Sequence, residues 1–328
     1  MQDESIMKGL RKDMLATLMS LKGFGPKSVF KIAEGAEGIE TPHAMYQYIS
    51  NLNEKRHRDL NLDELLSKYE ETQHLIERSK SEGIGMVGYY DSEFPDSLRN
   101  CVDEKGKPAA PLVLYYRGSL EVLRHPSVAM IGTREPTPNG VKAGRYFAEI
   151  FARQGFNIVS GLAIGCDTSA HEGALIGGGK TTAFLAHGLS WDSIYPKENL
   201  DLARRIVDEG GLLLSEYSID QAINRYQLVA RDRLQAGLSN GTIVIQTGEI
   251  GGTMHAVNAT IFANKPLFAV DFTFPEDQLH EKVQGNLMLF EEGKATRLNS
   301  KNVVSIMNQL LSSQKDIYQQ QTLFSGQE

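Results

Sequence analysis

The sequence predicts an α/β fold, a doubly wound and mainly parallel sheet that is preceded by a small all-α N-terminal domain. From Ser127 onward, short apolar runs alternate with segments of helical spacing, which is the pattern of strands and crossover helices in a parallel sheet. Before about residue 80, apolar residues recur only at helical spacing. We therefore expect a helical domain at 1–80, a sheet domain at 81–311 and a flexible polar tail at 312–328.

Composition places the chain among soluble globular proteins and sets limits on its partners. The 328 residues are 41% hydrophobic and 23% charged, with a net charge of −7. Such a charge argues modestly against nucleic acid, although a local basic groove can bind phosphates on an acidic protein. Cys101 and Cys166 lie far apart, which suits a reducing compartment. No run approaches the roughly 18–20 apolar residues of a membrane span, so we expect a cytoplasmic protein with no membrane contact.

The N-terminal domain contains one turn that could contact phosphate. Gly23-Phe24-Gly25 precedes a segment of helical spacing that carries Lys27 and Lys31, and this arrangement resembles a helix-hairpin-helix motif. Such a turn offers backbone N–H groups and a helix N-terminus to an anion. The alternative is a tight turn between two packed helices. Gly23, Gly25 and Lys27 are thus a candidate N-terminal phosphate turn.

Strands and helices of the sheet domain follow from the alternation of apolar runs and helical spacing. A connector that precedes the main alternation contributes two strands, and the remaining strands are short and apolar, as expected where helices cover both faces. The expected strands are 84–88, 111–118, 127–131, 156–159, 181–185, 211–215, 242–246, 266–270 and 294–298. The expected helices are 142–154, 168–175, 199–209, 231–238, 254–263 and 302–311.

Glycine turns follow several of these strands, at the edge where an open parallel sheet places its ligand. Gly132-Thr133-Arg134 comes after the first parallel strand and lacks the G-x-G-x-x-G spacing of a dinucleotide site, which argues against NAD. An arginine there suits a phosphate, which it can grip with two parallel hydrogen bonds, or it ties loops together. Ser160-Gly161 and Gly251-Gly252-Thr253 follow two other strands and let an anion approach a helix N-terminus.

One acidic residue and one histidine lie a helical turn apart after the second of these strands. Asp167 and His171 could face each other, but no third ligand is near in sequence, so we expect no metal site. We interpret Asp167 as an N-terminal helix cap.

A basic segment opens the helix that follows the strand at 211–215. Arg225, Arg231 and Arg233 can neutralise phosphates, and Tyr226 can stack on a base. At helical spacing Arg231 and Arg233 cannot point the same way, so one of them is expected to serve structure. Glu216 is a candidate partner for a rim arginine.

The rim offers binding groups without an evident nucleophile. The sequence contains no GxSxG elbow, no GxxxxGK[ST] loop, no HExxH and no Ser-His-Asp order. We therefore assign no catalytic residue and no cofactor.

Taken in order, these motifs resemble the DNA-processing protein family DprA, also called Smf, from about residue 90 to residue 307. The motifs that carry the resemblance are short and follow one another along the chain. They are Phe94-Pro95, Leu114 to Gly118, Val128 to Arg134, Ser160-Gly161 through His171, Gly188-Leu189, Tyr195-Pro196, Ser215-Glu216, Arg231 to Ser239 and Gln284-Gly285-Asn286.

The resemblance implies both a fold and a function. It implies an extended Rossmann-like domain that binds single-stranded DNA without sequence preference, protects incoming DNA, forms a homodimer and helps to load a RecA-type recombinase during natural transformation. It also implies that Arg134, Ser160, Gly161 and the segment from Arg231 to Arg233 line a phosphate pocket.

The chain departs from the family pattern at the basic segment and at one glycine turn. The family usually has Arg-Asn-Arg where this chain has Arg231-Asp232-Arg233, and an aromatic-proline pair where it has Leu228-Val229. Both departures weaken the expected contacts to DNA. Gly251-Gly252-Thr253 drifts toward the Gly-Gly-x-Gly-Thr turn of lysine-decarboxylase-like phosphoribohydrolases, although His255 stands where those enzymes carry a glutamate. The alternative function is therefore a Rossmann-like enzyme or sensor that acts on a small nucleotide.

Overall fold

The computed structural model describes residues 9–52 and 60–312. Residues 1–8 and 53–59, and the expected tail except for Ser312, lie outside the described residues. Within the described part, four helices precede a nine-stranded sheet. None of these described helices combines the length and the hydropathy that a bilayer span requires.

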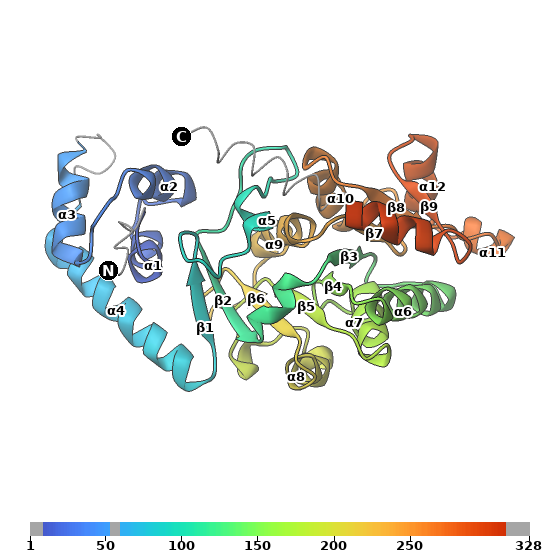
Figure 1. Cartoon of the computed structure of the whole chain (residues 1–328), viewed down its shortest axis with the longest axis horizontal. Coiled ribbons are helices and arrows are strands. Elements are labelled where there is room, and N and C mark those ends of the chain that lie inside the picture. Colours follow the sequence, from blue (N-terminus) through green and yellow to red (C-terminus); the bar gives the residue numbers. More distant parts are fainter. Residues whose placement is uncertain (1–8, 53–59, 313–328) are drawn as a thin grey trace, which may run out of the picture.

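The N-terminal helices form a layer at one end of the sheet (Figure 1). They are α1 (Lys12–Ser20), α2 (Pro26–Glu34), α3 (Pro42–Asn51) and α4 (Leu62–Ser81). Polar side chains begin two of them, because Thr41 accepts a hydrogen bond from the Ala44 amide and Asn61 accepts one from the Asp63 amide. Both α1 and α4 contact β1, so the helical layer packs directly on the sheet edge.

The sheet is parallel except at the edge that meets this helical layer. The strand order is β1-β2-β6-β5-β4-β3-β7-β8-β9, and the β1–β2 and β2–β6 pairs are antiparallel, so β2 alone runs opposite to the other strands. The strands are β1 (Gly85–Gly88), β2 (Val113–Gly118), β3 (Ser127–Ile131), β4 (Asn157–Ser160), β5 (Thr181–Leu185), β6 (Leu212–Ser215), β7 (Thr242–Val244), β8 (Leu267–Val270) and β9 (Thr296–Leu298).

Helices cover both faces, as the doubly wound class requires. Figure 1 shows α6, α7 and α8 below the sheet and α9 and α10 above it. The helices are α5 (Asp96–Arg99), α6 (Pro138–Arg153), α7 (Cys166–Ile176), α8 (Leu200–Asp208), α9 (Arg225–Leu238), α10 (Thr253–Phe262), α11 (Pro275–Gln278) and α12 (Gln284–Glu291), with helical backbone again at 303–312. The expected fold class is confirmed, and each expected strand is present.

The chain winds outward from β3 in both directions. It passes through β4, β5 and β6 on one side, then returns to β7, which pairs with the other side of β3. A topological switch point therefore lies between β3 and β7. In open α/β sheets the ligand crevice lies beyond the carboxyl ends of the strands at this point.

One hydrophobic cluster joins the helical N-terminal region to the sheet. Leu15 and Leu65 from the helices belong to the same buried cluster as Tyr115 and Leu185 from the strands. The proposed domain boundary near residue 81 therefore stays a prediction, because the two regions share one core.

Candidate functional site

A cavity of about 530 Å³ opens at the switch point, beyond the carboxyl ends of β3 and β7. The walls come from the turns after β3 and β7, the start of α9, the start of α10 and the loop before α12. Most of the predicted site residues meet there. Those that line the cavity are Gly132, Thr133, Arg134, Arg225, Arg231, Gly251, Gly252 and Thr253.

Two of the glycine turns are interlocked by backbone hydrogen bonds. The Cys166 amide donates to the Thr133 carbonyl at 3.1 Å, and the Thr133 amide donates to the Gln246 carbonyl at 2.7 Å. Gly165 lies between the turns with φ +86°, and a Cβ there would lie 2.6 Å from the carbonyl oxygens of Thr133 and Arg134. Only glycine fits this close approach at that backbone angle. The turns after β3 and β4 thus form one rigid wall.

Three cationic side chains stand around the mouth of the cavity. Arg134 and Arg225 are exposed, and neither has a side-chain hydrogen bond or ion pair within residues 9–52 and 60–312. Lys282 lies 3.3 Å from Glu281 and 3.6 Å from Glu135, so its charge is partly balanced. The N-terminus of α10 adds backbone N–H groups and a favourable dipole for an anion.

Arg231 is buried, and its guanidinium donates hydrogen bonds to three acceptors within the protein. Its Nη1 donates to the carbonyls of Gly161 and Phe184, the latter at 2.6 Å, and its Nε donates to Asp232 at 3.0 Å. Gly161 has no side chain, and a Cβ there would lie 1.9 Å from Nη1. Arg231 therefore ties the ends of β4 and β5 to α9.

Arg233 is also engaged in structure. Its Nη1 and Nη2 donate to the two oxygens of Glu216 at 2.8 and 2.6 Å, and its Nε donates to the Ala109 carbonyl at 2.8 Å. The predicted role of Glu216 as partner of a rim arginine is confirmed. One of the two arginines was expected to serve structure, and in the fold Arg231 and Arg233 both do.

The remaining predicted residues lie away from the cavity. Ser160 is fully buried and donates to the Met130 carbonyl at 2.7 Å, so its hydroxyl cannot reach a ligand. Gly25 is the N-cap of α2, and its amide donates to the Ser28 hydroxyl at 3.0 Å. The N-terminal phosphate turn of Gly23, Gly25 and Lys27 stays a prediction.

Two carboxylates lie in the inner wall. Asp167 accepts hydrogen bonds from the Gly161 and Ala163 amides, both at 3.2 Å, whereas the N-cap of α7 is Gly165. The interpretation of Asp167 as a helix cap was therefore wrong, since it closes the preceding loop. Burial raises the pKa of Asp167, and Arg231 opposes that rise. Burial also raises the pKa of Asp232 to about 6, again opposed by Arg231.

His171 belongs to the core and not to the site. Its Nδ1 lies 2.7 Å from the Thr181 hydroxyl, and burial lowers its pKa to about 3. In the described ranges, no group of three or more His, Cys, Asp or Glu side chains is arranged to hold a metal ion.

Several residues that line the same cavity are not among the predicted site residues. Lys282 comes from the loop before α12, and Gln235 and Ile250 come from α9 and from the turn after β7. Lys282 lies only two residues before Gln284-Gly285-Asn286, one of the motifs noted above, and this proximity could have pointed to it. Nothing in the spacing distinguishes Gln235 from other helical glutamines.

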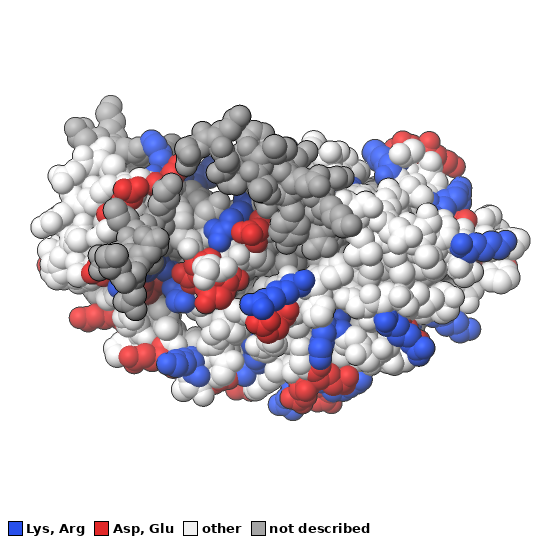
Figure 2. All heavy atoms as spheres, in the orientation of Figure 1, with Lys and Arg blue, Asp and Glu red and all other residues white. Residues whose placement is uncertain are grey.

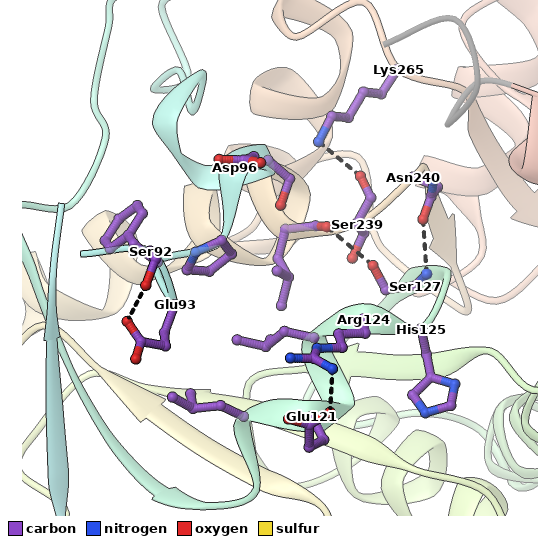
Figure 3. Close-up of a pocket in the computed structure, with 16 residues that line it drawn as sticks. Ser92, Glu93, Asp96, Glu121, Arg124, His125, Ser127, Ser239, Asn240 and Lys265 are labelled. Carbon is purple, nitrogen blue, oxygen red and sulfur yellow. Dashed lines mark hydrogen bonds and ion pairs between the residues drawn. The ribbon is translucent and has the colours of Figure 1, made fainter. Parts of the chain in front are cut away.

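A second cavity, of about 630 Å³, lies at the opposite edge of the sheet (Figure 3). Figure 3 shows an ion pair between Arg124 and Glu121 and a hydrogen bond between Ser127 and Asn240. The Arg124 Nη1 lies 3.0 Å from the Glu121 Oε2, and the Ser127 amide donates to the Asn240 Oδ1 at 2.8 Å. Lys265 donates to the Ala236, Gly237 and Ser239 carbonyls, and burial lowers its pKa to about 8. None of the predicted site residues lines this cavity.

The described surface carries mixed charge. On the face drawn in Figure 2, Lys and Arg lie among Asp and Glu over much of the described surface, and some Lys and Arg stand without a carboxylate beside them. Because the net charge of the chain is −7, the overall charge does not favour an anionic ligand, and only a local group of cations could do so.

Comparison with known proteins connects this arrangement to one family. The family model described as DNA recombination-mediator protein A matches residues 85–310. Protein Smf of Synechocystis is 35% identical over 210 residues, which cover 63% of this chain and 49% of that protein. DNA processing protein DprA of Bacillus subtilis is 27% identical over 232 residues, which cover 70% of this chain and 74% of that protein.

Two solved structures are similar over most of the fold. DprA from Streptococcus pneumoniae superposes with a TM-score of 0.66 at 25% identity, covering 90% of this chain and 94% of that chain. A structure that concerns the single-stranded DNA binding mode of DNA processing protein A from Helicobacter pylori superposes with a TM-score of 0.58 at 30% identity, covering 70% and 96%. The sequence match spans 49% of the Synechocystis relative, 46% of the Escherichia coli relative and 65% of the Streptococcus pneumoniae relative.

Proposed function

This chain belongs to the DNA recombination-mediator protein A family, and on that premise we propose that it binds single-stranded DNA at the carboxyl edge of its sheet. The observation that carries the proposal is the group of Arg134, Arg225 and Lys282 around one cavity, beside the N-terminus of α10. A strand of DNA presents phosphates at regular intervals, and cations spaced around a crevice neutralise several of them together.

A base can stack beside these phosphate contacts. Tyr226 follows Arg225 at the start of α9, and its side chain is 78% exposed. An exposed ring next to a phosphate-binding cation is the usual arrangement for binding single strands with little sequence preference. Tyr226 thereby replaces the aromatic residue that the family usually carries at the position of Leu228.

Binding of a labelled oligothymidylate over a salt series tests this proposal. For single strands, each phosphate contact contributes about 0.7 to the negative slope of log affinity against log salt. Arg134→Ala and Arg225→Ala should each weaken binding and lower the slope by about that amount. Arg153→Ala is the matched control, because Arg153 is an exposed arginine on α6 that pairs with Glu149. Equal affinities for all four proteins would contradict the assignment.

The proposal extends to the partners that the family resemblance implies. A homodimer that protects incoming DNA and helps to load a RecA-type recombinase is the expected working form. Light scattering of the purified protein measures the dimer, and strand exchange by a RecA-type recombinase with and without this protein measures loading. A monomer without effect on strand exchange would remove this part of the proposal and leave DNA binding untouched.

A small-nucleotide enzyme or sensor is the second candidate. Asp167 and Asp232 favour it, because two buried carboxylates with raised pKa in a crevice are a common arrangement in active sites. Incubation with nucleoside monophosphates, followed by chromatography for free base, separates the candidates. Release of base that is lost in Asp232→Asn would favour the enzyme over the DNA-binding protein.

A further inference from the structure

The inner wall of the switch-point cavity carries hydrogen-bond acceptors, in contrast to its cationic mouth. Asp232 receives hydrogen bonds from Arg231 and Gln235, and both fall on the same oxygen, Oδ1. Its side chain is 15% exposed and lines the cavity, and among the described residues no hydrogen bond falls on its other oxygen, Oδ2. Asp167 adds a second carboxylate to the same wall.

Gln235 supplies a further acceptor. Its Nε2 donates to Asp232 at 3.1 Å, and turning the amide over would bring two oxygens together, so the orientation is determined by this contact. Its Oε1 is buried without a hydrogen-bond partner among the described residues, although the residue lines the cavity and is only 2% exposed. A buried acceptor without a partner is destabilising, and an N–H donor from a ligand would satisfy it.

The inner wall is not suited to bind a phosphate, although it contains the buried Arg231. The guanidinium of Arg231 is already engaged by the Gly161 and Phe184 carbonyls and by Asp232. A phosphate placed there would meet Asp232 and Asp167, and the one guanidinium beside them is already occupied. Phosphates therefore belong at the mouth, on Arg134, Arg225 and Lys282, and the interior suits a neutral group with N–H donors.

A nucleobase has this chemistry, and guanine matches it best. Guanine presents two neighbouring donors, N1–H and the N2 amino group, which match two acceptors of this wall, Asp232 Oδ2 and Gln235 Oε1. Adenine and cytosine place an acceptor beside their amino group, and thymine has a single N–H between two carbonyls. A cavity of about 530 Å³ is large enough for one nucleotide unit. Leu228, Val229 and Ile250, the last 95% exposed, supply apolar surface for the faces of the base.

We propose that this cavity receives one unstacked guanine of the bound strand, which Asp232 and Gln235 recognise while the flanking phosphates lie on the cationic mouth. The inference rests on the proposed binding of single-stranded DNA and adds a base preference at one position. It follows from the acceptors in this chain, and above all from Asp232.

Anisotropy at pH 8 with three oligonucleotides of equal length tests the inference. They are oligothymidylate, the same strand with one central guanine, and the same strand with one central inosine, which lacks the N2 amino group. The guanine strand should bind about tenfold more tightly than oligothymidylate, as expected for a bidentate base contact, and the inosine strand should fall between them. Equal affinities of the guanine and thymine strands would overturn the inference.

Variants of the two acceptors separate this inference from the function on which it rests. Asp232→Asn and Gln235→Leu should each remove most of the preference for guanine, measured as the ratio of the affinities for the guanine strand and for oligothymidylate. Asp220→Asn, at an exposed carboxylate that pairs with Arg78, should leave the preference unchanged. A preference that survives in both cavity variants contradicts the assignment to Asp232 and Gln235. Failure of the wild-type protein to bind any of the strands would instead contradict the proposed function itself.

Discussion

At the scale of single residues, the buried charges around Arg231 decide what the cavity can hold. One guanidinium faces two carboxylates, because Asp232 bonds to it directly and Asp167 is close enough for its pKa to be affected. Burial raises the pKa of both carboxylates, and the single cation opposes both rises. With all three groups ionised, this part of the wall carries a net charge of −1, since one positive charge meets two negative ones.

The ionisation of Asp232 makes the stability of the protein depend on pH in a defined direction. The folded pKa of about 6 lies above the ordinary value of 3.8, so the folded state binds the proton more tightly than the unfolded state. This contribution to stability is complete below pH 3.8 and is lost as the pH rises through about 6. The wild type should therefore lose roughly 1–1.5 kcal/mol of stability between pH 5 and pH 8 that Asp232→Asn keeps.

Urea denaturation of both proteins at pH 5 and pH 8 measures this difference. The asparagine side chain of the variant keeps an oxygen that can accept from Arg231 and Gln235, so the comparison isolates the charge. Asp201→Asn is the control, because its carboxylate is 92% exposed. A variant whose stability changes with pH as the wild type does would show that Asp232 does not ionise in this range.

At the scale of elements, the two glycine turns after β3 and β4 act as one unit. The prediction concerns Gly165, where an added Cβ would meet the Thr133 and Arg134 carbonyls at 2.6 Å. Gly165→Ala should destabilise the protein by about 3–5 kcal/mol, since it combines an unfavourable positive φ with a clash against backbone. It should also weaken DNA binding, because the clash displaces the turn that carries Arg134.

Gly155→Ala provides the matched comparison for that change. Gly155 also has a positive φ, +83°, and an added Cβ there would meet no atom within 4 Å. Its cost should be limited to the backbone term, about 1–2 kcal/mol, with DNA binding unchanged. Thermal denaturation and oligonucleotide binding of both variants measure these effects. Equal losses of stability in the two variants would show that the turns are not interlocked as described.

Elements were predictable from the sequence where periodicity alone decides them. Apolar runs predicted every strand, but helix α9 begins at Arg225, six residues before the expected start at 231. Asn224 and Gln227 form a capping box that starts the helix there, and this polar pair has no hydrophobic periodicity. The reversed direction of β2 was also not predictable, since short apolar runs carry no information about strand direction.

Site residues were predictable where the turn chemistry is local, as for Gly132 to Arg134. The roles of the arginines were not. Arg225, Arg231 and Arg233 look alike in sequence, and only the folded chain shows that the last two are occupied by Gly161, Phe184 and Glu216. Partners that are 17 to 70 residues away determine which guanidinium is left for a ligand.

At the scale of the whole molecule, the helical N-terminal region and the sheet share one core. Leu15 on α1 is fully buried in the cluster that also contains Tyr115 and Leu185 of the sheet. Arg78 on α4 pairs with Asp220 after β6, with 3.1 Å between Nη2 and Oδ1. A region joined in this way should unfold together with the sheet and not before it.

The single tryptophan provides a probe of this cooperativity. Trp191 follows β5 and packs against the same cluster, with the guanidinium of Arg117 4.4 Å from its ring centre. Leu15→Ala, which leaves a cavity in α1, should destabilise the protein by about 2–5 kcal/mol. Because the core is shared, urea transitions by tryptophan fluorescence and by circular dichroism should coincide and shift together. Val304→Ala is the control, because Val304 lies near the far end of the sheet and is mostly exposed. A fluorescence transition that stays in place while part of the dichroism signal is lost earlier would show that the helical region unfolds independently.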